Sequence, residues 1–371
     1  MIIFDISMLE NILIPHMNLS DLKEILFNKL KLRKACDIHM LTVEHLRFAG
    51  EESLSLILSL LNLIIDNINC LSSRQQNTAV ASVIHKGKNK PVHDHKSYRQ
   101  VRVTPLIARC IEEFIRPNLI TLTKPIQNSS QYGFSKGVSY LLGALQRHEV
   151  EKFCVDSKKT FFGCSLDGQS AFEVVNREIL MRELYCAGER GKFWLASKYS
   201  YTDTQTQIKM DGQLSRNFYE ELGVKQGHCR SSDSYKIYVN TLLDMVDQAN
   251  LGVWIGPVNA GSSACADDEY LMSDSQSKMQ ALLSIAEHYG EMYQTTYGAS
   301  KTKITVVGCE QDMQYYKDVS PWKLNGDQIK VTVDNEHLGQ IVSGKDQEQK
   351  NVDLKLSKAR GALFSLLGPA F

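Results

Sequence analysis

The sequence carries no excess of charge of either sign, because 42 lysines and arginines balance 42 aspartates and glutamates over its 371 residues. A nucleic-acid partner therefore cannot be inferred from net charge and would need a local basic surface. The nine cysteines are odd in number, scattered and never spaced C-x-x-C. Neither a disulfide framework nor a zinc knuckle is indicated, and a reducing compartment fits this pattern best.

Long hydrophobic runs and a basic leader are also lacking. The most apolar segment, residues 54–68, is interrupted by Asn62 and Asp66 and is shorter than the roughly 20 residues that a membrane span needs. Residues 1–17 carry acidic side chains where a secretory signal would be basic. We expect segment 54–68 to be a buried helix, and we expect no membrane partner.

What is present is an ordinary globular composition with one basic stretch. Hydrophobic residues make up 43% of the chain and charged residues 23%, and the length allows more than one lobe of about 100–200 residues. Between Val83 and Val103 the only acid is Asp94. The cations that gather there are Lys86, Lys88, Lys90, Lys96, Arg99 and Arg102. This stretch is either a phosphate-binding surface or a solvated loop, and its His93-Asp94-His95 triplet is more typical of a polar loop than of a metal site.

Hydrophobic periodicity predicts helices and strands that alternate irregularly. Apolar spacing indicates packed helices within residues 19–69, and a helix over residues 104–120 is expected to end at Pro117. An Asp211-Gly212 turn predicts a strand pair near it. Further helices are predicted at residues 234–250 and 276–292, and further strands at residues 161–166 and 303–308. The expected fold class is α+β, with helices mostly on one face of the sheet.

Two aspartates lie side by side in the stretch SSACADDEYLMSDS. Adjacent carboxylates repel, and in a partly dry site one of them would hold its proton unless a cation lay between them. Asp267 and Asp268 therefore suggest a metal site, although aspartate is also a common turn residue that could close a surface hairpin. Asp167 directly follows the predicted strand 161–166, at the kind of strand end where sites in mixed sheets tend to open. On neighbouring strands, these three carboxylates would offer hard oxygen ligands for two Mg²⁺ ions and in-line phosphoryl transfer.

Further motifs flank these acids in a definite order. From the N-terminus they are KLRKACDIHMLTVEHL, VIHKGK with SYRQVRVTPLIARCIEEFI, QYGFSKG, SLDGQSAFEVV, GVKQGH, CADD, YGASKTKI and HLGQIVSG. With these motifs in this order, the chain resembles the reverse transcriptases of LINE-type retrotransposons, which lack long terminal repeats. The resemblance covers nearly all of the chain.

The resemblance implies a role for each motif residue. Asp167, Asp267 and Asp268 are the implied catalytic carboxylates and the ligands of two Mg²⁺ ions. The implied substrate contacts are Lys86 and Arg99 toward the incoming triphosphate, Phe172 as the gate that excludes a ribose 2′-hydroxyl, Gln226 and Gly227 beside the nucleotide and template, and Lys301 near the departing pyrophosphate. Fixed cations suit charge that builds on phosphates in the transition state. Without the resemblance, Phe172 would be interpreted as core packing, and Lys301 could equally be an exposed surface lysine.

The family also implies a right-hand polymerase architecture of fingers, palm and partial thumb, with an antiparallel palm sheet backed by helices. We expect a helical N-terminal extension at residues 1–80, fingers at 81–160, a palm with the catalytic aspartates at 161–308, and a primer-grip region with the start of a truncated thumb at 309–371. The implied partners are an RNA template, a DNA primer and deoxynucleoside triphosphates, in the nucleus or the cytoplasm.

The sequence departs from the family pattern in the palm. Cys265 replaces the usual tyrosine, Glu173 stands where an aspartate is common, and HCRSSDS follows Gln226-Gly227 in place of Cys-Pro-Leu-Ser-Pro. The leading hypothesis is an RNA-directed DNA polymerase. The alternative is an inactive, truncated element remnant that binds RNA or an RNA–DNA duplex through the basic stretch. An RNA-copying polymerase is disfavoured, because the Phe172 ring should clash with a ribose 2′-hydroxyl.

Overall fold

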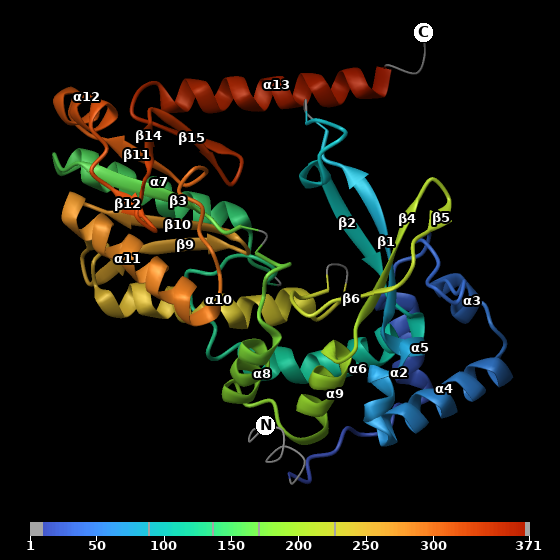
Figure 1. The fold of residues 1–371 in the computed structure, drawn as a ribbon. Coiled ribbons are helices and arrows are strands. Elements are labelled where there is room, and N and C mark those ends of the chain that lie inside the picture. Colours follow the sequence, from blue (N-terminus) through green and yellow to red (C-terminus); the bar gives the residue numbers. More distant parts are fainter. Residues whose placement is uncertain (1–9, 88–89, 136, 170, 226–227, 368–371) are drawn as a thin grey trace. The chain divides into compact units, whose positions relative to one another are not determined.

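The computed structural model describes residues 10–87, 90–135, 137–169, 171–225 and 228–367, and contacts divide the chain into two compact units. Unit 1 consists of residues 1–127 and 172–238, and unit 2 of residues 128–171 and 239–371. Each unit has its own sheet (Figure 1). The expected division into extension, fingers, palm and thumb follows function rather than contacts and stays a prediction.

Unit 1 contains most of the helices of the N-terminal third. They are α2 (Leu19–Glu24), the π-helix η1 (Ile25–Lys29), α3 (Val43–Arg47), α4 (Glu51–Asp66), the 3₁₀-helix η2 (Ile68–Ser72), α5 (Arg74–Asn77), the 3₁₀-helix η3 (His95–Ser97) and α6 (Leu106–Thr123). Two more, α8 (Arg177–Cys186) and α9 (Gly191–Tyr201), come from its second segment, and α10 (Ser231–Ala249) begins in unit 1 and continues into unit 2. The predicted helix at residues 54–68 is confirmed as α4, but only one face of it is buried, because Leu56 and Leu63 remain exposed. In the described part of the chain, no helix is long and apolar enough to cross a membrane.

Helix α6 corrects one expectation. Pro117 was expected to end the helix, but α6 continues through it to Thr123. A proline inside a helix has no N–H for the carbonyl four residues earlier, which here belongs to Glu113. The Lys29 ammonium donates to that carbonyl at 3.4 Å, so the acceptor that Pro117 leaves over has a partner. The buried apolar face, which includes Ile111, Ile115 and Leu119, holds the helix together across the proline.

The sheet of unit 1 has the strand order β2 (Tyr98–Val103), β1 (Thr78–His85), β4 (Gln205–Met210) and β5 (Gln213–Leu214), and β6 (Phe218–Tyr219) also pairs with β4. Strands β1 and β4 are parallel, and the other pairs are antiparallel. Asp211 and Gly212 connect β4 to β5 with φ values of 51° and 81°. Positive φ at both central residues is what a tight hairpin turn with a native twist requires, so the predicted Asp-Gly hairpin is confirmed.

Unit 2 is built on a sheet with the order β14 (Lys330–Thr332), β11 (Lys303–Val307), β3 (Phe161–Asp167), β10 (Asp268–Ser273) and β9 (Ser262–Cys265). All neighbours are antiparallel except β11 and β14. Helices α7 (Tyr140–Asp156) and α11 (Gln276–Tyr293) contact its strands. Val150 of α7 belongs to one buried hydrophobic cluster with Phe161, Tyr270 and Met272 of the sheet. The predicted antiparallel sheet backed by helices is confirmed.

The remaining elements of unit 2 are short strands and two helices. They are the hairpins β7 (Val253–Ile255) with β8 (Val258–Ala260), β12 (Lys323–Leu324) with β13 (Asp327–Gln328), and β15 (Asp334–His337) with β16 (Gln340–Ser343), together with α12 (Glu310–Asp318) and α13 (Gln347–Leu367).

Candidate active site

Asp167 and Asp268 face each other across two neighbouring strands of unit 2. Asp167 is the last residue of β3, Asp268 is the first of β10, and the antiparallel register pairs these two residues directly. Residues paired in this way have their Cβ atoms about 5 Å apart on the same face of the sheet. Asp267 lies next to them in the two-residue turn between β9 and β10, where Ala266 has a φ of 63°. Asp167 and the adjacent pair Asp267 and Asp268, which are remote from each other in sequence, thus bring three carboxylates to one end of the sheet.

The electrostatics of this cluster favour a cation. Asp267 and Asp268 are exposed, yet partial burial of the Asp268 carboxyl, followed by the charges of Asp267 and Asp167, raises the pKa of Asp268. Mutual repulsion of carboxylates is what a divalent metal relieves, and carboxylate oxygens are the ligands that Mg²⁺ prefers. The donor set therefore fits Mg²⁺. Within the described residues, no three His, Cys, Asp or Glu side chains already stand in the geometry of a metal site.

Lys301 makes an ion pair with one of the three acids. Its Nζ lies 3.4 Å from Oδ2 of Asp167, and 73% of its side chain is exposed. An exposed pair of this kind contributes little to stability, about 0–1 kcal/mol, so the lysine is free to exchange this partner for another anion. The structure thus places Lys301 beside the carboxylates, but its predicted contact with pyrophosphate stays a prediction.

The hairpin turn that carries Asp267 is held by residues that sequence reasoning did not single out. Oε1 of Gln131 accepts the N–H groups of Ala266 at 3.0 Å and Gly133 at 2.8 Å. A Cβ on Gly133 would lie 2.4 Å from the backbone nitrogen of Ala266, so only glycine fits there. The motif QYGFSKG thus packs its first residues against the aspartate turn. The sequence motif QYGFSKG pointed to this segment, but the sequence alone did not predict that it contacts the turn at Ala266.

The backbone of Asp167 is also tied down. Its N–H donates to Oγ1 of Thr302 at 3.1 Å, and its carbonyl accepts the N–H of Gly298 at 3.0 Å. Glu269, which follows Asp268 on β10, is buried. Burial raises its pKa, its hydrogen bond to Tyr297 lowers it, and the charges of Asp267 and Asp268 raise it again, to about 8. Glu269 is therefore protonated at neutral pH and adds no charge to the cluster.

Lys86 and Arg99 lie on the β1–β2 hairpin of unit 1. The register pairs Ile84 with Arg99, and Lys86 directly follows β1, where its N–H donates to the carbonyl of Ser97 at 2.8 Å. Both cations are exposed. Arg102 is different, because its guanidinium lies 2.9 Å from the Glu220 carboxylate and both side chains are mostly buried. Arg102 therefore belongs to the interior of unit 1 rather than to the basic surface expected from the sequence.

The predicted gate residue Phe172 is partly buried in unit 1. Its ring stacks on Tyr235 with 4.3 Å between centroids and 20° between planes. Its carbonyl accepts the N–H of Val224 at 2.8 Å. Phe172 is thus neither a fully buried core residue nor a loose surface ring, and its role as a gate stays a prediction. Gln226 and Gly227 lie outside the described residues.

Comparison with known proteins decides the family. The sequence profile of the family described as "Reverse transcriptase (RNA-dependent DNA polymerase)" matches residues 84–347. The chain belongs to this reverse transcriptase family. Among solved structures, the apo telomerase from Candida tropicalis, truncated from its C-terminal domain, matches with a TM-score of 0.50 and 12% sequence identity. The match covers 74% of this chain and 55% of that one, so this chain spans little more than half the length of that telomerase. At this identity the likeness shows the fold, and the predicted right-hand polymerase class is confirmed.

The stretch after Gln226-Gly227, in which this reverse transcriptase departs from the family pattern, is well packed in unit 1. Nδ1 of His228 lies 2.6 Å from Oε1 of Glu112, and Arg230 pairs with Glu189. Both glutamates are buried. Burial alone would raise the pKa of Glu112, but the positive charges around it outweigh burial and hold that pKa low. His228 and Arg230, which stand where the family pattern has other residues, therefore have buried acidic partners. The sequence did not predict these partners, because they are far away in the chain.

Lys225, just before the two undescribed residues, is also buried. Its ammonium donates to the side-chain oxygen of Asn77, and burial, together with the charges of Arg177 and Arg102, lowers its pKa to about 7. The predicted substrate loop is the motif GVKQGH, residues 223–228. Because the side chains of Lys225 and His228 are both buried in unit 1, this loop is anchored on both sides of Gln226-Gly227.

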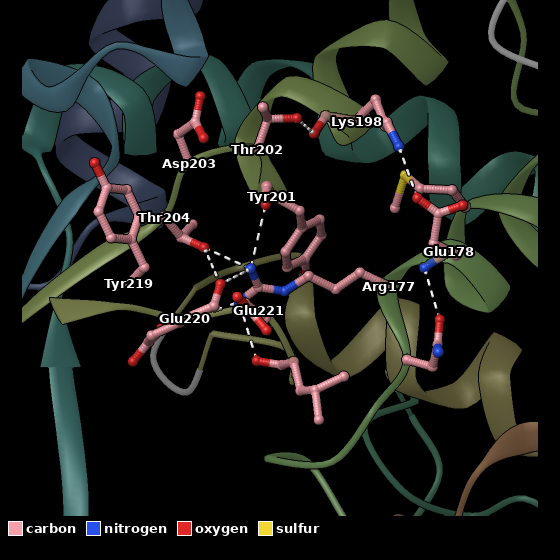
Figure 2. Close-up of a pocket in the computed structure, with 13 residues that line it drawn as sticks. Arg177, Glu178, Lys198, Tyr201, Thr202, Asp203, Thr204, Tyr219, Glu220 and Glu221 are labelled. Atoms are coloured by element: carbon pink, nitrogen blue, oxygen red, sulfur yellow. Dashed lines mark hydrogen bonds and ion pairs between the residues drawn. The ribbon is translucent and has the colours of Figure 1, made fainter. Parts of the chain in front are cut away.

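A polar pocket of about 390 Å³ lies in unit 1 (Figure 2). Figure 2 shows Arg177 reaching between Tyr201, Thr204 and Glu220. Its guanidinium donates to the carbonyls of Tyr201, Glu220, Leu222 and Gly223 and to the Thr204 hydroxyl. With its donors used in this way, Arg177 is a structural residue that fastens the chain leading into the substrate loop. None of the three aspartates lines this pocket.

Proposed function

We propose that this chain is an RNA-directed DNA polymerase that adds deoxynucleotides to a primer 3′-hydroxyl by two-metal phosphoryl transfer. The observation that carries the proposal is the register of β3 and β10, which sets Asp167 opposite Asp268 with Asp267 in the adjoining turn. Partial burial, followed by the charges of Asp267 and Asp167, raises the pKa of Asp268, and a bound cation would relieve both effects.

In the proposed reaction, the primer 3′-hydroxyl gives its proton to solvent and its oxygen bonds to the α-phosphorus of the nucleotide. The bond from that phosphorus to the oxygen bridging the β-phosphate breaks, and pyrophosphate leaves. Two Mg²⁺ ions held by Asp167, Asp267 and Asp268 would supply a lowered pKa for the hydroxyl and a counter-charge for the leaving oxygen. Lys86 and Arg99 hold the triphosphate, because fixed cations stabilise charge that grows on its oxygens. Lys301 releases Asp167 and turns to the pyrophosphate.

The finer assignments rest on the sequence motifs. Phe172 excludes a ribose 2′-hydroxyl, and Gln226 with Gly227 positions the nucleotide against the template. The partners are an RNA template, a DNA primer and deoxynucleoside triphosphates, and no membrane takes part. The order of motifs supports an origin in a LINE-type retrotransposon without long terminal repeats, acting in the nucleus or the cytoplasm.

Primer extension on poly(rA)/oligo(dT) with Mg²⁺ tests the proposal. We expect wild type to incorporate dTMP, and we expect Asp167→Asn and the double variant Asp267→Ala, Asp268→Ala to lose all but background incorporation. Asp211→Asn is the matched control, because it removes a carboxylate from an exposed hairpin turn in which asparagine is equally favourable. Equal incorporation by wild type and the double variant would refute polymerase activity.

The same samples distinguish an inactive element remnant. For a remnant we expect RNA–DNA duplex binding that weakens steeply with salt, because phosphate contacts release counterions. Nucleotide binding would not depend on Mg²⁺ in that case. For the polymerase, calorimetry should show dTTP binding that requires Mg²⁺ and the three aspartates.

A further inference from the structure

The segment that carries Phe172 is fastened by helix α10 at two points. The Tyr235 ring stacks on Phe172, and one turn later the Tyr238 hydroxyl accepts the N–H of Asn176 at 3.2 Å. Tyr235 is 5% exposed and Tyr238 is 1% exposed, so both rings are locked in the interior of unit 1. A helix is a rigid support, and side chains three positions apart on it lie on one face. The position of the Phe172 ring is therefore set by a buried ring rather than by solvent.

The other side of the segment is bonded to the backbone of the substrate loop. The N–H of Val224 donates to the Phe172 carbonyl, and the N–H of Gly223 donates to the Val175 carbonyl, both at 2.8 Å. Gly223 has a φ of +85°, and a Cβ there would lie 2.7 Å from the carbonyl oxygen of Glu173, so glycine is required for this approach. The backbone of Phe172 is thus held by the loop, while its ring is held by Tyr235.

We infer that Tyr235 is a specificity-determining positioning residue: its ring fixes the angle and depth of the Phe172 ring, and so it sets how strongly the polymerase prefers a deoxyribose to a ribose. The inference rests on the proposed function. It does not follow from the motif residues, because Tyr235 lies in α10, beyond the substrate loop. Without the stacked partner, the Phe172 ring gains rotamer freedom and can move away from a 2′-hydroxyl. The kcat/KM for a ribonucleotide should therefore rise more than the kcat/KM for a deoxynucleotide.

The experiment measures kcat/KM for dTTP and for UTP on poly(rA)/oligo(dT) and takes their ratio as the discrimination. Tyr235→Leu should lower the discrimination about 2- to 10-fold, which is the range expected for loss of one aromatic pair. The change should come mainly from a higher kcat/KM for UTP. Tyr235→Phe keeps the ring and should match wild type. Tyr219→Leu is the matched control, since Tyr219 is 67% exposed on β6 of the same unit.

A double-mutant cycle separates positioning from general loosening. Phe172→Ala should lower the discrimination by itself, and Tyr235→Leu added to it should change nothing further, because Tyr235 acts through the Phe172 ring. Tyr235→Met, an unbranched side chain that fills irregular gaps, replaces the leucine variant if circular dichroism shows that the latter does not fold.

The outcomes are distinct. If wild type incorporates dTMP but the Tyr235 variants discriminate as Tyr219→Leu does, the inference is overturned and the proposed function stands. An independent, additive loss in the Phe172→Ala background also overturns it. If wild type incorporates no dTMP, the proposed function fails and the inference fails with it.

Discussion

Among single residues, Gln131 has the most direct hold on the aspartate turn. Its Oε1 accepts the N–H of Ala266, the left-handed residue just before Asp267. Gln131→Met has a similar length and no acceptor, so it leaves this buried N–H unpaired and frees the turn. We expect kcat to fall about tenfold or more with little change in KM for dTTP.

The control for this prediction is Gln131→Glu, which retains an acceptor oxygen at the same place and should recover most of the activity. Circular dichroism establishes that both variants fold. A folded Gln131→Met protein with wild-type kcat would mean that the turn holds Asp267 without this bond.

His337 predicts a pH dependence of stability. Burial, followed by the charge of Arg147, lowers its pKa from 6.5 to about 3, and its ring lies 4.5 Å from that of Tyr270. Between these two pKa values the unfolded chain binds a proton that the native state does not. The free energy of unfolding therefore rises with pH across this window, and stability present above pH 6.5 is lost as the pH falls.

His337→Phe keeps a ring against Tyr270 and removes the proton. The free energy of unfolding is measured with urea at pH 7 and at pH 5. Between these two pH values it should fall by about 2 kcal/mol more in wild type than in the variant. Equal losses in the two proteins would mean that His337 takes up its proton in the native state as readily as in the unfolded chain.

At the scale of elements, Arg177 joins the start of α8 to the chain that follows β6. Arg177→Met removes donors from several backbone carbonyls at once, and we expect the free energy of unfolding to fall by about 3 kcal/mol or more. Lys198→Met is the matched control from the same pocket, since the partner of Lys198, Glu178, is exposed. It should cost less than about 1 kcal/mol. Chemical denaturation compares the two variants, and equal losses would contradict the structural role of Arg177.

Elements were predictable where local pattern decides them. Helix α11 and strand β3 follow from apolar periodicity, and the β4–β5 hairpin follows from Asp211-Gly212, because each depends on neighbours in the chain. Helix α6 was predicted too short, because the compensation for Pro117 comes from Lys29, which is remote in sequence.

The candidate site shows the same limit. The motifs named Asp167, Asp267 and Asp268, but the register that pairs Asp167 with Asp268 is a property of the folded sheet. The partners of the unusual stretch after Gly227 were out of reach for the same reason. The sequence does not indicate that His228 pairs with Glu112, because burial and the pairing of charges depend on long-range packing.

Over the whole molecule, the residues with predicted roles divide between the units. Asp167, Asp267, Asp268 and Lys301 belong to unit 2, whereas Lys86, Arg99 and Phe172 belong to unit 1. The carboxylate cluster is complete within its own unit, because β3 and the β9–β10 hairpin supply all of it. Substitutions of Lys86 and Arg99 should therefore weaken triphosphate binding without weakening metal binding, whereas substitutions of the aspartates should weaken both.

Calorimetry on the full chain tests this division, first with Mg²⁺ alone and then with dTTP in the presence of Mg²⁺. The double variant Lys86→Ala, Arg99→Ala removes only the fixed cations. Its Kd for Mg²⁺ should stay within about twofold of the wild-type value, and its Kd for dTTP should rise about tenfold or more. Lys209→Ala, Arg216→Ala is the matched control, since it removes the same charge from exposed positions of the same unit. Asp268→Asn should weaken the binding of Mg²⁺ directly, and it should weaken the binding of dTTP only because less metal is bound. If the Lys86 and Arg99 substitutions weakened Mg²⁺ as much as dTTP, the metal would not be held by the carboxylates of unit 2 alone, and the assignment of roles to the two units would be wrong.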